Sequence, residues 1–219
     1  MKKCALVIGL GISLFFFISC KKDKSSTTAP ATQASTPSVS DYFPLKTGNY
    51  WVYKTTECDS NGNIIAGTYK NDSVIIKNDT LINSKTYHTV VEYNFMNCPT
   101  PSMQYYTDSA DCVVTNYGKI VFSIKNTSGV IYTQMVYADS SVYINYFCIK
   151  TPVSISVPSG TYSCVDFEGA LYEKSNNFDK AYLTHHYYSE NIGLVKRTAF
   201  YLSNPLNIIN LDLLSYHVQ

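Results

Sequence analysis

Between Asp41 and Gln219 the chain consists of short runs of β-branched and aromatic residues separated by turn residues. Tyr50–Thr56 is one such run, and Asn116-Tyr117-Gly118 is one of the turns. These residue types fit a pleated, half-buried surface, and turns every ~8–12 residues are typical of antiparallel sheets. Apart from one helical turn expected at Asn176–Ala181, no window of this part shows the apolar period of about 3.6 residues that an amphipathic helix needs. The pattern predicts an all-β domain.

About a dozen short strands are predicted, and they follow one another along the chain. The runs are Tyr50–Thr56, Ile64–Ala66, Ser73–Lys77, Leu81–Ile82, Tyr87–Tyr93, Cys112–Thr115, Ile120–Ile124, Val130–Tyr137, Val142–Ile149, Val153–Val157, Thr161–Glu168, Tyr182–Ser189, Leu194–Arg197 and Leu211–Val218. Turn residues at Asn78-Asp79, Pro158-Ser159-Gly160 and Glu190–Gly193 separate neighbouring runs. We expect an antiparallel meander that curves into a half-barrel or open barrel, although strand spacing alone does not exclude a sandwich.

The first residues have the pattern of a bacterial export signal. Met1-Lys2-Lys3 is basic, and the uncharged, almost wholly apolar run Ala5–Ile18 is shorter than the ~20 residues that a membrane-spanning helix needs. The run ends at Phe17-Ile18-Ser19-Cys20, which resembles the lipobox of bacterial lipoproteins. This resemblance implies cleavage before Cys20 and attachment of acyl chains, such as palmitate, to its sulfur. A plain signal peptide or an N-terminal anchor helix is the alternative.

Three segments follow from this reading: a lipoprotein signal peptide over residues 1–19, the lipidated cysteine with a linker over 20–40, and one all-β domain over 41–219. Residues 25–40 are rich in Ser, Thr, Ala and Pro, and such a stretch cannot bury a core. In the Gram-negative sorting scheme, Asp directly after the cysteine favours the inner membrane. Lys21 stands there instead, which favours the outer membrane, and Lys22-Asp23 resembles part of a signal for transport to the cell surface.

Charge and composition narrow the classes of partner. The formal net charge is +1, and no basic run occurs beyond residues 21–24. Binding to phosphate backbones needs clustered Lys and Arg, so nucleic acid is not expected as a partner. Expected contacts are the membrane, through lipid on Cys20, and a hydrophobic ligand or another envelope protein.

The cysteine pattern leaves the redox state open. After Cys20 the chain carries an odd set, namely Cys58, Cys98, Cys112, Cys148 and Cys164. Pairing of Cys98 with Cys112 and of Cys148 with Cys164 is one interpretation, and five buried free thiols are the other. No CxxC motif or His-rich cluster indicates a metal site, and neither a metal nor a cofactor is expected.

Three segments together resemble those of uncharacterised envelope lipoproteins of the TapB-like kind. They are Tyr42–Tyr53, with Gly48-Asn49 as a turn before Trp51, then Val157–Cys164, and then Tyr187–Lys196. The resemblance implies an antiparallel half-barrel related to lipoprotein-carrier domains. The matching residues are structural, so the resemblance assigns no catalytic residue.

His185-His186 is the best candidate for acid–base or metal chemistry, with Glu168, Asp179 and Glu190 near it in the sequence. Adjacent residues on a strand point to opposite faces, so both histidines cannot bind one metal ion without a bulge. One histidine on the sheet surface and one against a tyrosine is the more ordinary arrangement. No catalytic residue and no metal ligand is predicted, and an enzyme is not favoured.

The chain has 20 Tyr, 10 Phe and one Trp, which is a heavy aromatic content. So many tyrosine hydroxyls cannot all be buried without partners, which suggests that some line a groove. Candidate ligand-facing residues are Tyr132, Tyr143, Tyr182 and Tyr187, with scattered cross-strand pairs as the alternative. The leading hypothesis is therefore a non-enzymatic, membrane-anchored envelope lipoprotein that binds a hydrophobic or extended ligand on a concave sheet. A surface interaction module within an envelope complex is the second hypothesis, and an envelope hydrolase using His185-His186 is the third.

Overall fold

The computed structural model describes residues 36–59, 61–94, 100–125, 128–137, 141–174, 181–201 and 204–219. The predicted signal peptide, residues 20–35 of the predicted lipidated cysteine and linker, Cys98 and Asp179 lie outside these residues. The helical turn expected at Asn176–Ala181 also lies outside them, apart from its last residue. One compact unit runs from Thr36 to Gln219.

This unit contains one short helix and, within the described residues, twelve strands. They are α1 (Val39–Tyr42), β1 (Tyr50–Cys58), β2 (Lys70–Ile82), β3 (Lys85–Tyr93), β4 (Ser102–Ser109), β5 (Cys112–Thr115), β6 (Ile120–Ser123), β7 (Tyr132–Met135), β8 (Val142–Val157), β9 (Gly160–Glu173), β10 (Ala181–Ser189), β11 (Gly193–Tyr201) and β12 (Asn204–His217). The prediction of an all-β chain is confirmed.

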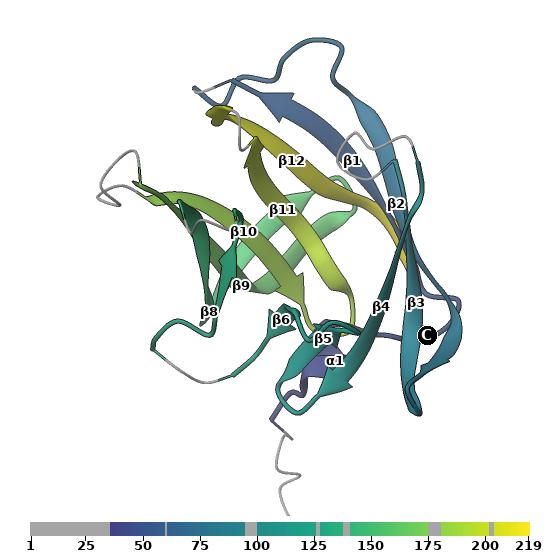
Figure 1. Cartoon of the computed structure of the whole chain (residues 1–219). Helices are drawn as coiled ribbons and strands as arrows, with labels where there is room; N and C mark the ends of the chain where they lie inside the picture. Colours follow the sequence, from purple (N-terminus) through teal and green to yellow (C-terminus); the bar gives the residue numbers. More distant parts are fainter. Residues whose placement is uncertain are drawn as a thin grey trace, which may run out of the picture. The chain divides into compact units, whose positions relative to one another are not determined.

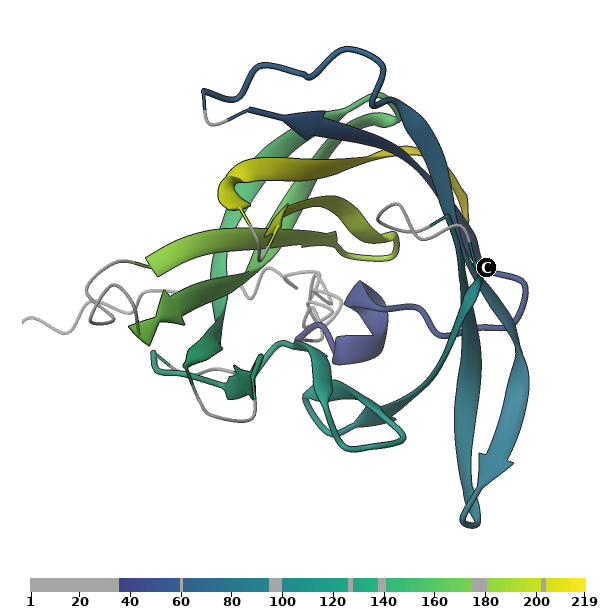
Figure 2. The ribbon, with the colours of Figure 1, turned by 45° about the horizontal axis from the view of Figure 1, so that its top comes forward.

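The strands form a single antiparallel meander that curls into a nearly closed barrel (Figures 1 and 2). Their order in the sheet is β6-β5-β4-β3-β2-β1-β12-β11-β10-β9-β8-β7, so the last strand returns to pair with the first. The two edges of the sheet are therefore β6 and β7, which are neighbours in sequence. We call the line between these two unpaired edges the seam.

Several strand boundaries differ from the prediction. Ser73–Lys77 and Leu81–Ile82 belong to one strand, β2, and the turn expected at Asn78-Asp79 is a register shift between Ile76 and Asn78. The real turn is at Asn83-Ser84, where both residues have positive φ, as a tight hairpin between twisted strands requires. Val142–Ile149 and Val153–Val157 likewise merge into β8 across an irregularity. A bulge accommodates an extra residue without ending the strand, and residue types alone do not distinguish it from a turn.

Two elements were missed and one was shorter than expected. Strand β4 was not among the predicted runs, and Pro99 and Pro101, which disfavour regular strand pairing, lie just before it in the sequence. Helix α1 was also missed. It begins at Val39, which is 3 % exposed and packs into the core. Folded structure therefore reaches into the last residues of the predicted linker. The expected strand Ile64–Ala66 contributes only one isolated bridge, between Cys58 and Ile64.

Aromatic side chains from distant strands meet in the barrel interior. Phe122 on β6 is fully buried, and its ring centre lies 4.2 Å from that of Tyr188 on β10 and 5.8 Å from that of Phe167 on β9. Phe43, which follows α1, contacts Tyr106, Phe122 and Tyr188. The backbone N–H of Asn191 donates to the carbonyl of Asp41 at 2.6 Å, which ties α1 to the β10–β11 turn. This N-terminal segment packs at one end of the barrel (Figure 1).

The thiols of Cys58, Cys112, Cys148 and Cys164 are free. Pairing of Cys148 with Cys164 does not occur, because the β8–β9 register sets Cys148 opposite Phe167 and Cys164 opposite Val153. The partner suggested for Cys112, Cys98, lies outside the described residues. Burial raises the pKa of the Cys164 thiol to about 12, so it stays protonated at neutral pH.

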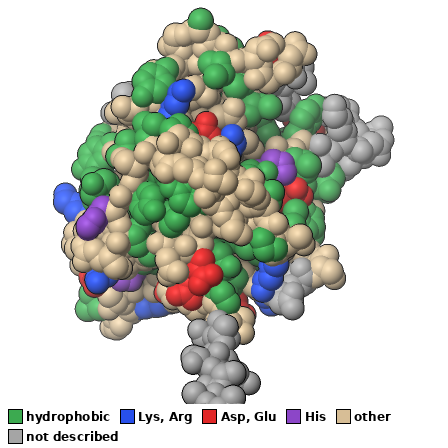
Figure 3. Space-filling view, turned by 180° about the vertical axis from the view of Figure 1, so that it is seen from behind, with side chains coloured by type: hydrophobic (Ala, Val, Ile, Leu, Met, Phe, Trp, Pro, Cys, Tyr) green, Lys and Arg blue, Asp and Glu red, His purple; other side chains and the backbone are tan. Residues whose placement is uncertain are grey.

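Among the described helices, none has the length and apolar character needed to cross a membrane. The face shown in Figure 3 carries scattered basic and acidic side chains between polar and hydrophobic ones. Large exposed hydrophobic residues such as Leu81, Met103 and Tyr117 come from different hairpins. Single exposed apolar residues of this kind are ordinary for a protein surface.

Candidate functional site

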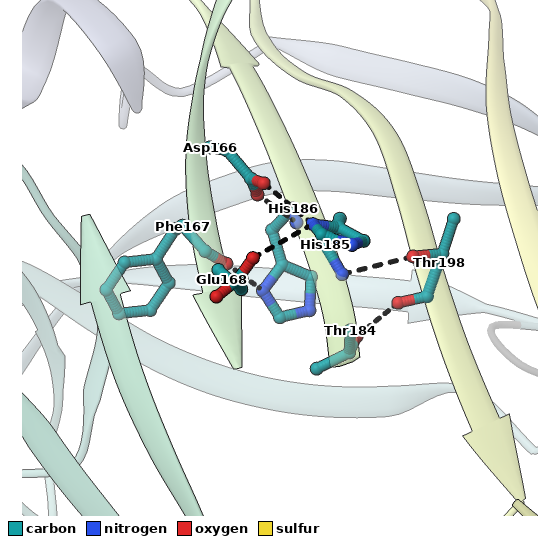
Figure 4. A network of polar contacts seen from close by, with 7 residues as sticks. All are labelled: Asp166, Phe167, Glu168, Thr184, His185, His186 and Thr198. Carbon is teal, nitrogen blue, oxygen red and sulfur yellow. Dashed lines mark hydrogen bonds and ion pairs between the residues drawn. The ribbon is translucent and has the colours of Figure 1, made fainter. Parts of the chain in front are cut away.

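The two histidines of β10 point to opposite faces of the sheet, as strand alternation predicts. His186 is 9 % exposed and lines the barrel interior, where its ring lies near those of Tyr146 and Phe167. The side chain of His185 is 28 % exposed and contacts Asp166 and Glu168 on β9 (Figure 4). The two histidines therefore belong to two separate sites: His185 to an outer site on the barrel surface, and His186 to an inner site in the barrel interior.

On the outer site, His185 forms a close pair with a carboxylate. Its Nδ1 lies 2.7 Å from Oδ2 of Asp166 and 3.7 Å from Oε2 of Glu168. The hydrogen bond to Asp166 raises the pKa of His185, and burial raises the pKa of Glu168. The ring of Tyr187 stacks on that of His185, with centres 5.6 Å apart. Asp166 also accepts the backbone N–H of His186 at 3.2 Å, which holds its carboxylate in place.

The chemistry that this outer cluster can support is restricted. Asp166, Glu168 and His185 offer ligand atoms that all lie within 4.8 Å of one another. Nδ1 of His185 already bonds to Asp166, and a hydrolase that forms a covalent intermediate would also need a nucleophilic side chain near the histidine. The protonated Cys164 thiol does not supply one. Of the other acids named with the histidines, Glu190 is exposed at the β10–β11 turn.

The His185–Asp166 pair predicts a pH-dependent part of the stability. The pKa of His185 is higher in the folded than in the unfolded protein, where it is about 6.5. Its pairing with Asp166 therefore stabilises the fold fully below about pH 6.5, and this stabilisation is lost as pH rises through the folded-state pKa. Replacing His185 by Phe should therefore lower the free energy of unfolding more at pH 6 than at pH 9. A charge-assisted hydrogen bond suggests a difference on the order of 1 kcal/mol, measurable by urea denaturation.

His88→Phe is the matched control for this prediction. Nδ1 of His88 lies 2.8 Å from Oδ1 of Asp79, but the side chain of Asp79 is 57 % exposed, and exposed ion pairs contribute little. A loss in His185→Phe that is equal at both pH values would show that its role is packing against Tyr187 rather than pairing with Asp166.

The inner site consists of three adjoining cavities within the barrel. One of about 110 Å³ is mostly apolar, and its walls include Trp51, Tyr53, Ile76 and Val90. A second of about 250 Å³ and a third of about 210 Å³ share Lys119, Tyr146, His186 and Arg197 in their walls. Arg197 lines all three cavities. Apolar walls with a few convergent polar groups are typical of small-molecule sites.

The charged groups of these cavities influence one another. Partial burial of its ammonium group and the nearby guanidinium of Arg197 lower the pKa of Lys119, although the residue as a whole is exposed. Burial, with a further contribution from Arg197, holds the pKa of His186 well below its usual value, so this ring is neutral at pH 7. Nδ1 of His186 lies 3.0 Å from the carbonyl oxygen of Phe167; the neutral ring therefore donates from Nδ1 and keeps Nε2 as an acceptor. Burial raises the pKa of Tyr106, Tyr146 and Tyr188, so their hydroxyls remain protonated.

The four tyrosines proposed from the sequence lie elsewhere. None of them is among the residues that line these three cavities. Tyr132 stacks near Tyr146, Tyr143 stacks on Tyr172, Tyr182 packs near Phe200, and Tyr187 stacks on His185. These contacts are largely the cross-strand pairs of the alternative interpretation. Contact of the four with a ligand stays a prediction.

Sequence reasoning did not identify Lys119 and Arg197. Arg197 pairs with His186 across β10 and β11, so the two side chains share a face. That pairing was accessible in principle, because Tyr182–Ser189 and Leu194–Arg197 were predicted as a hairpin. Lys119, by contrast, joins them only through closure of the barrel, which brings the start of β6 near β11.

Comparison with known proteins assigns no family. No protein-family model and no curated protein matches the chain. A Bacteroides fragilis protein described as exported, with a YmcC-like fold, aligns over 78% of this chain and 96% of its own, at 9% identity and a TM-score of 0.45. A Parabacteroides distasonis protein described as a lipoprotein aligns over 80% of this chain and 98% of its own, at 15% identity and a TM-score of 0.42. Neither likeness assigns an activity to this chain.

Proposed function

We propose that the chain is a non-enzymatic lipoprotein of a bacterial envelope whose barrel binds a small hydrophobic ligand. The observation that supports binding is the set of adjoining interior cavities. The smallest cavity has mostly apolar walls, and the two larger ones carry the polar and charged groups. A largely apolar site with a few placed polar groups is typical of the binding of small molecules. The inward-facing Tyr53, Tyr106, Tyr146 and Tyr188 make this concave surface rich in tyrosine.

We propose that the signal peptide, residues 1–19, is cleaved and that lipid on Cys20 anchors the protein to a membrane. The run Phe17-Ile18-Ser19-Cys20 supports it, and more than one acyl chain on a lipoprotein cysteine would make anchoring stable, since a single chain binds only marginally. Lys21 after the cysteine supports an outer-membrane address, and Lys22-Asp23 supports exposure at the cell surface. Location in the outer membrane and exposure at the cell surface are both part of the proposal.

Mass spectrometry of the full-length protein, purified from bacterial membranes in maltoside detergent, tests both parts. Under denaturing conditions we expect a chain that begins at Cys20 and carries covalent acyl mass. Under native conditions we expect an additional discrete mass that denaturation releases. Cys20→Ala should abolish the covalent mass, and the protein should still carry the releasable mass.

The outcomes separate the two parts of the proposal. An unmodified Cys20 in the wild-type protein would refute the anchor, whatever the barrel binds. A native mass equal to the denatured mass, in every detergent tried, would argue against a stably bound ligand and in favour of the interaction-module hypothesis.

A further inference from the structure

The two charged cavities lie next to the seam of the barrel. Lys119 directly precedes β6, and Gln134 lies on β7, the two unpaired edges of the sheet. Both residues line the cavity of about 210 Å³, so this cavity touches both sides of the seam. Lys119 is an exposed residue, whereas Tyr188 and His186 deeper in the walls are buried. A molecule entering between β6 and β7 therefore meets Lys119 first.

The walls of these cavities carry an excess of positive charge. Among the described residues, Lys119 and Arg197 are the charged ones that line the cavity of about 210 Å³. In the adjoining cavity of about 250 Å³, Glu92 is the carboxylate that lines the wall with them, among the described residues. Glu92 also accepts a hydrogen bond from Ser102 Oγ at 2.8 Å. Two cations close enough to influence one another inside a protein favour occupancy by an anion.

The neighbouring groups suit an oxyanion as well. The guanidinium of arginine presents a planar set of donors that matches a carboxylate or a phosphate, and lysine adds a second charge-assisted hydrogen bond. The protonated hydroxyls of Tyr106 and Tyr188 are further donors along the same walls. The neutral His186 places no additional positive charge beside them.

The walls become apolar away from the seam. The cavity of about 110 Å³ shares a wall with the cavity of about 250 Å³, and this wall includes the charged residues Glu92 and Arg197. Away from that shared wall, it is formed mainly by side chains such as Phe43, Trp51 and Ile76. The walls are thus charged next to the seam and apolar farther inside. A purely apolar ligand would make no polar contact with the charged groups at the seam.

We infer that the ligand is an anionic amphiphile, with a carboxylate or phosphate head held by Lys119 and Arg197 and a hydrocarbon tail in the apolar cavity lined by Trp51. This inference rests on the proposed function, because it names the chemical class of the ligand bound in the same barrel. The head at the seam and the tail inside set the direction of binding.

Trp51 allows a direct test, because it is the only tryptophan of the chain and lines the apolar cavity. The full-length protein is placed in phosphatidylcholine vesicles and titrated at pH 8 with 10-bromodecanoic acid or with 10-bromodecanol. The bromine quenches Trp51 fluorescence only when the tail occupies the cavity. The two probes share a tail and differ in the charge of the head.

The double variant Lys119→Met/Arg197→Met should raise the half-quenching concentration of the acid roughly 10–100-fold, the range expected for losing charge-assisted hydrogen bonds. The half-quenching concentration of the alcohol should change less than about 2-fold. Lys196→Met is the matched control, because Lys196 is the neighbour of Arg197 on β11 but pairs with Asp212 at 3.0 Å instead of lining a cavity. If the methionine variant folds poorly, the single variants Lys119→Arg and Arg197→Lys are used in its place. Each keeps the positive charge and should largely preserve binding of the acid.

Each remaining outcome has one meaning. If both probes quench Trp51 and the double variant affects them equally, the inference is wrong while the proposed function stands. If neither probe quenches Trp51 in the wild-type protein, both fail. If the alcohol quenches Trp51 and the acid does not, the cavities reject a charged head, and the anionic amphiphile is refuted.

Discussion

Replacing Phe122 by alanine is expected to lower the free energy of unfolding by about 3–5 kcal/mol, the usual cost of deleting a buried aromatic ring. Phe122 is fully buried although β6 is an edge strand. Its ring contacts Tyr188 and Phe167, which belong to strands near the other edge of the same sheet. These contacts cross the interior without backbone hydrogen bonds between the two edges, so the ring substitutes for the missing strand pairing.

Denaturation in urea measures this loss, and Tyr117→Ala is its control. Tyr117 precedes the same strand and is 88% exposed, so its truncation should cost less than about 0.5 kcal/mol. We further expect the amides of β5 and β6 to exchange faster with solvent in Phe122→Ala, because local opening of an edge needs less energy once its packing is lost. A loss below about 1 kcal/mol would be inconsistent with a barrel held at its seam by this ring.

Replacing Trp51 by alanine should be similarly costly, at about 3–5 kcal/mol. Trp51 is 5% exposed on β1, and its indole Nε1–H donates to the carbonyl of Ile192 at 2.6 Å. Gly193 follows in the β10–β11 turn with φ of +100°, and a Cβ there would lie 3.2 Å from Trp51 Nε1. The indole therefore fills the space under this turn and joins two parts of the barrel that are distant in sequence.

Trp51→Phe separates packing from hydrogen bonding at this position. It retains a ring but leaves the Ile192 carbonyl without its donor, for which we expect a loss of about 1–3 kcal/mol. Tyr50→Ala, at the neighbouring half-exposed position of β1, should cost less than Trp51→Phe. Urea denaturation followed by circular dichroism suits all three variants, since the tryptophan signal is absent from two of them. Equal losses in Trp51→Ala and Trp51→Phe would assign the whole effect to the hydrogen bond.

The prediction of strands succeeded where residue type and periodicity agree, and failed where a strand is irregular. The β-branched and aromatic runs of β1, β3 and β10 and the turn at Pro158–Gly160 were found. The Asn78-Asp79 pair was interpreted as a turn because both residues favour turns, yet β2 continues through it, with a hydrogen bond between Asp79 and His88 of β3. The cross-strand partner, which a local pattern does not contain, decides such cases.

In the candidate site, too, local pattern predicted some features and cross-strand contacts decided the others. Alternation along β10 was enough to predict that His185 and His186 serve different faces, because the side-chain period of a strand is fixed by its backbone. It did not reveal that His185 meets Asp166 or that His186 shares its cavity with Lys119 and Arg197. Those contacts depend on the β9–β10 and β10–β11 registers and on which strands the curved sheet brings together.

The amino-acid sequence by itself therefore determined the fold class, the antiparallel meander and the expectation of an export signal, because each depends on local residue types and their spacing. Tertiary structure alone decided that β12 pairs with β1, that the edges of the sheet are β6 and β7, and that the charges of Lys119 and Arg197 line one interior. The physical reason is that closure depends on twist and register summed over all strands. That sum places residues 78 positions apart in the same cavity, and no local window contains both.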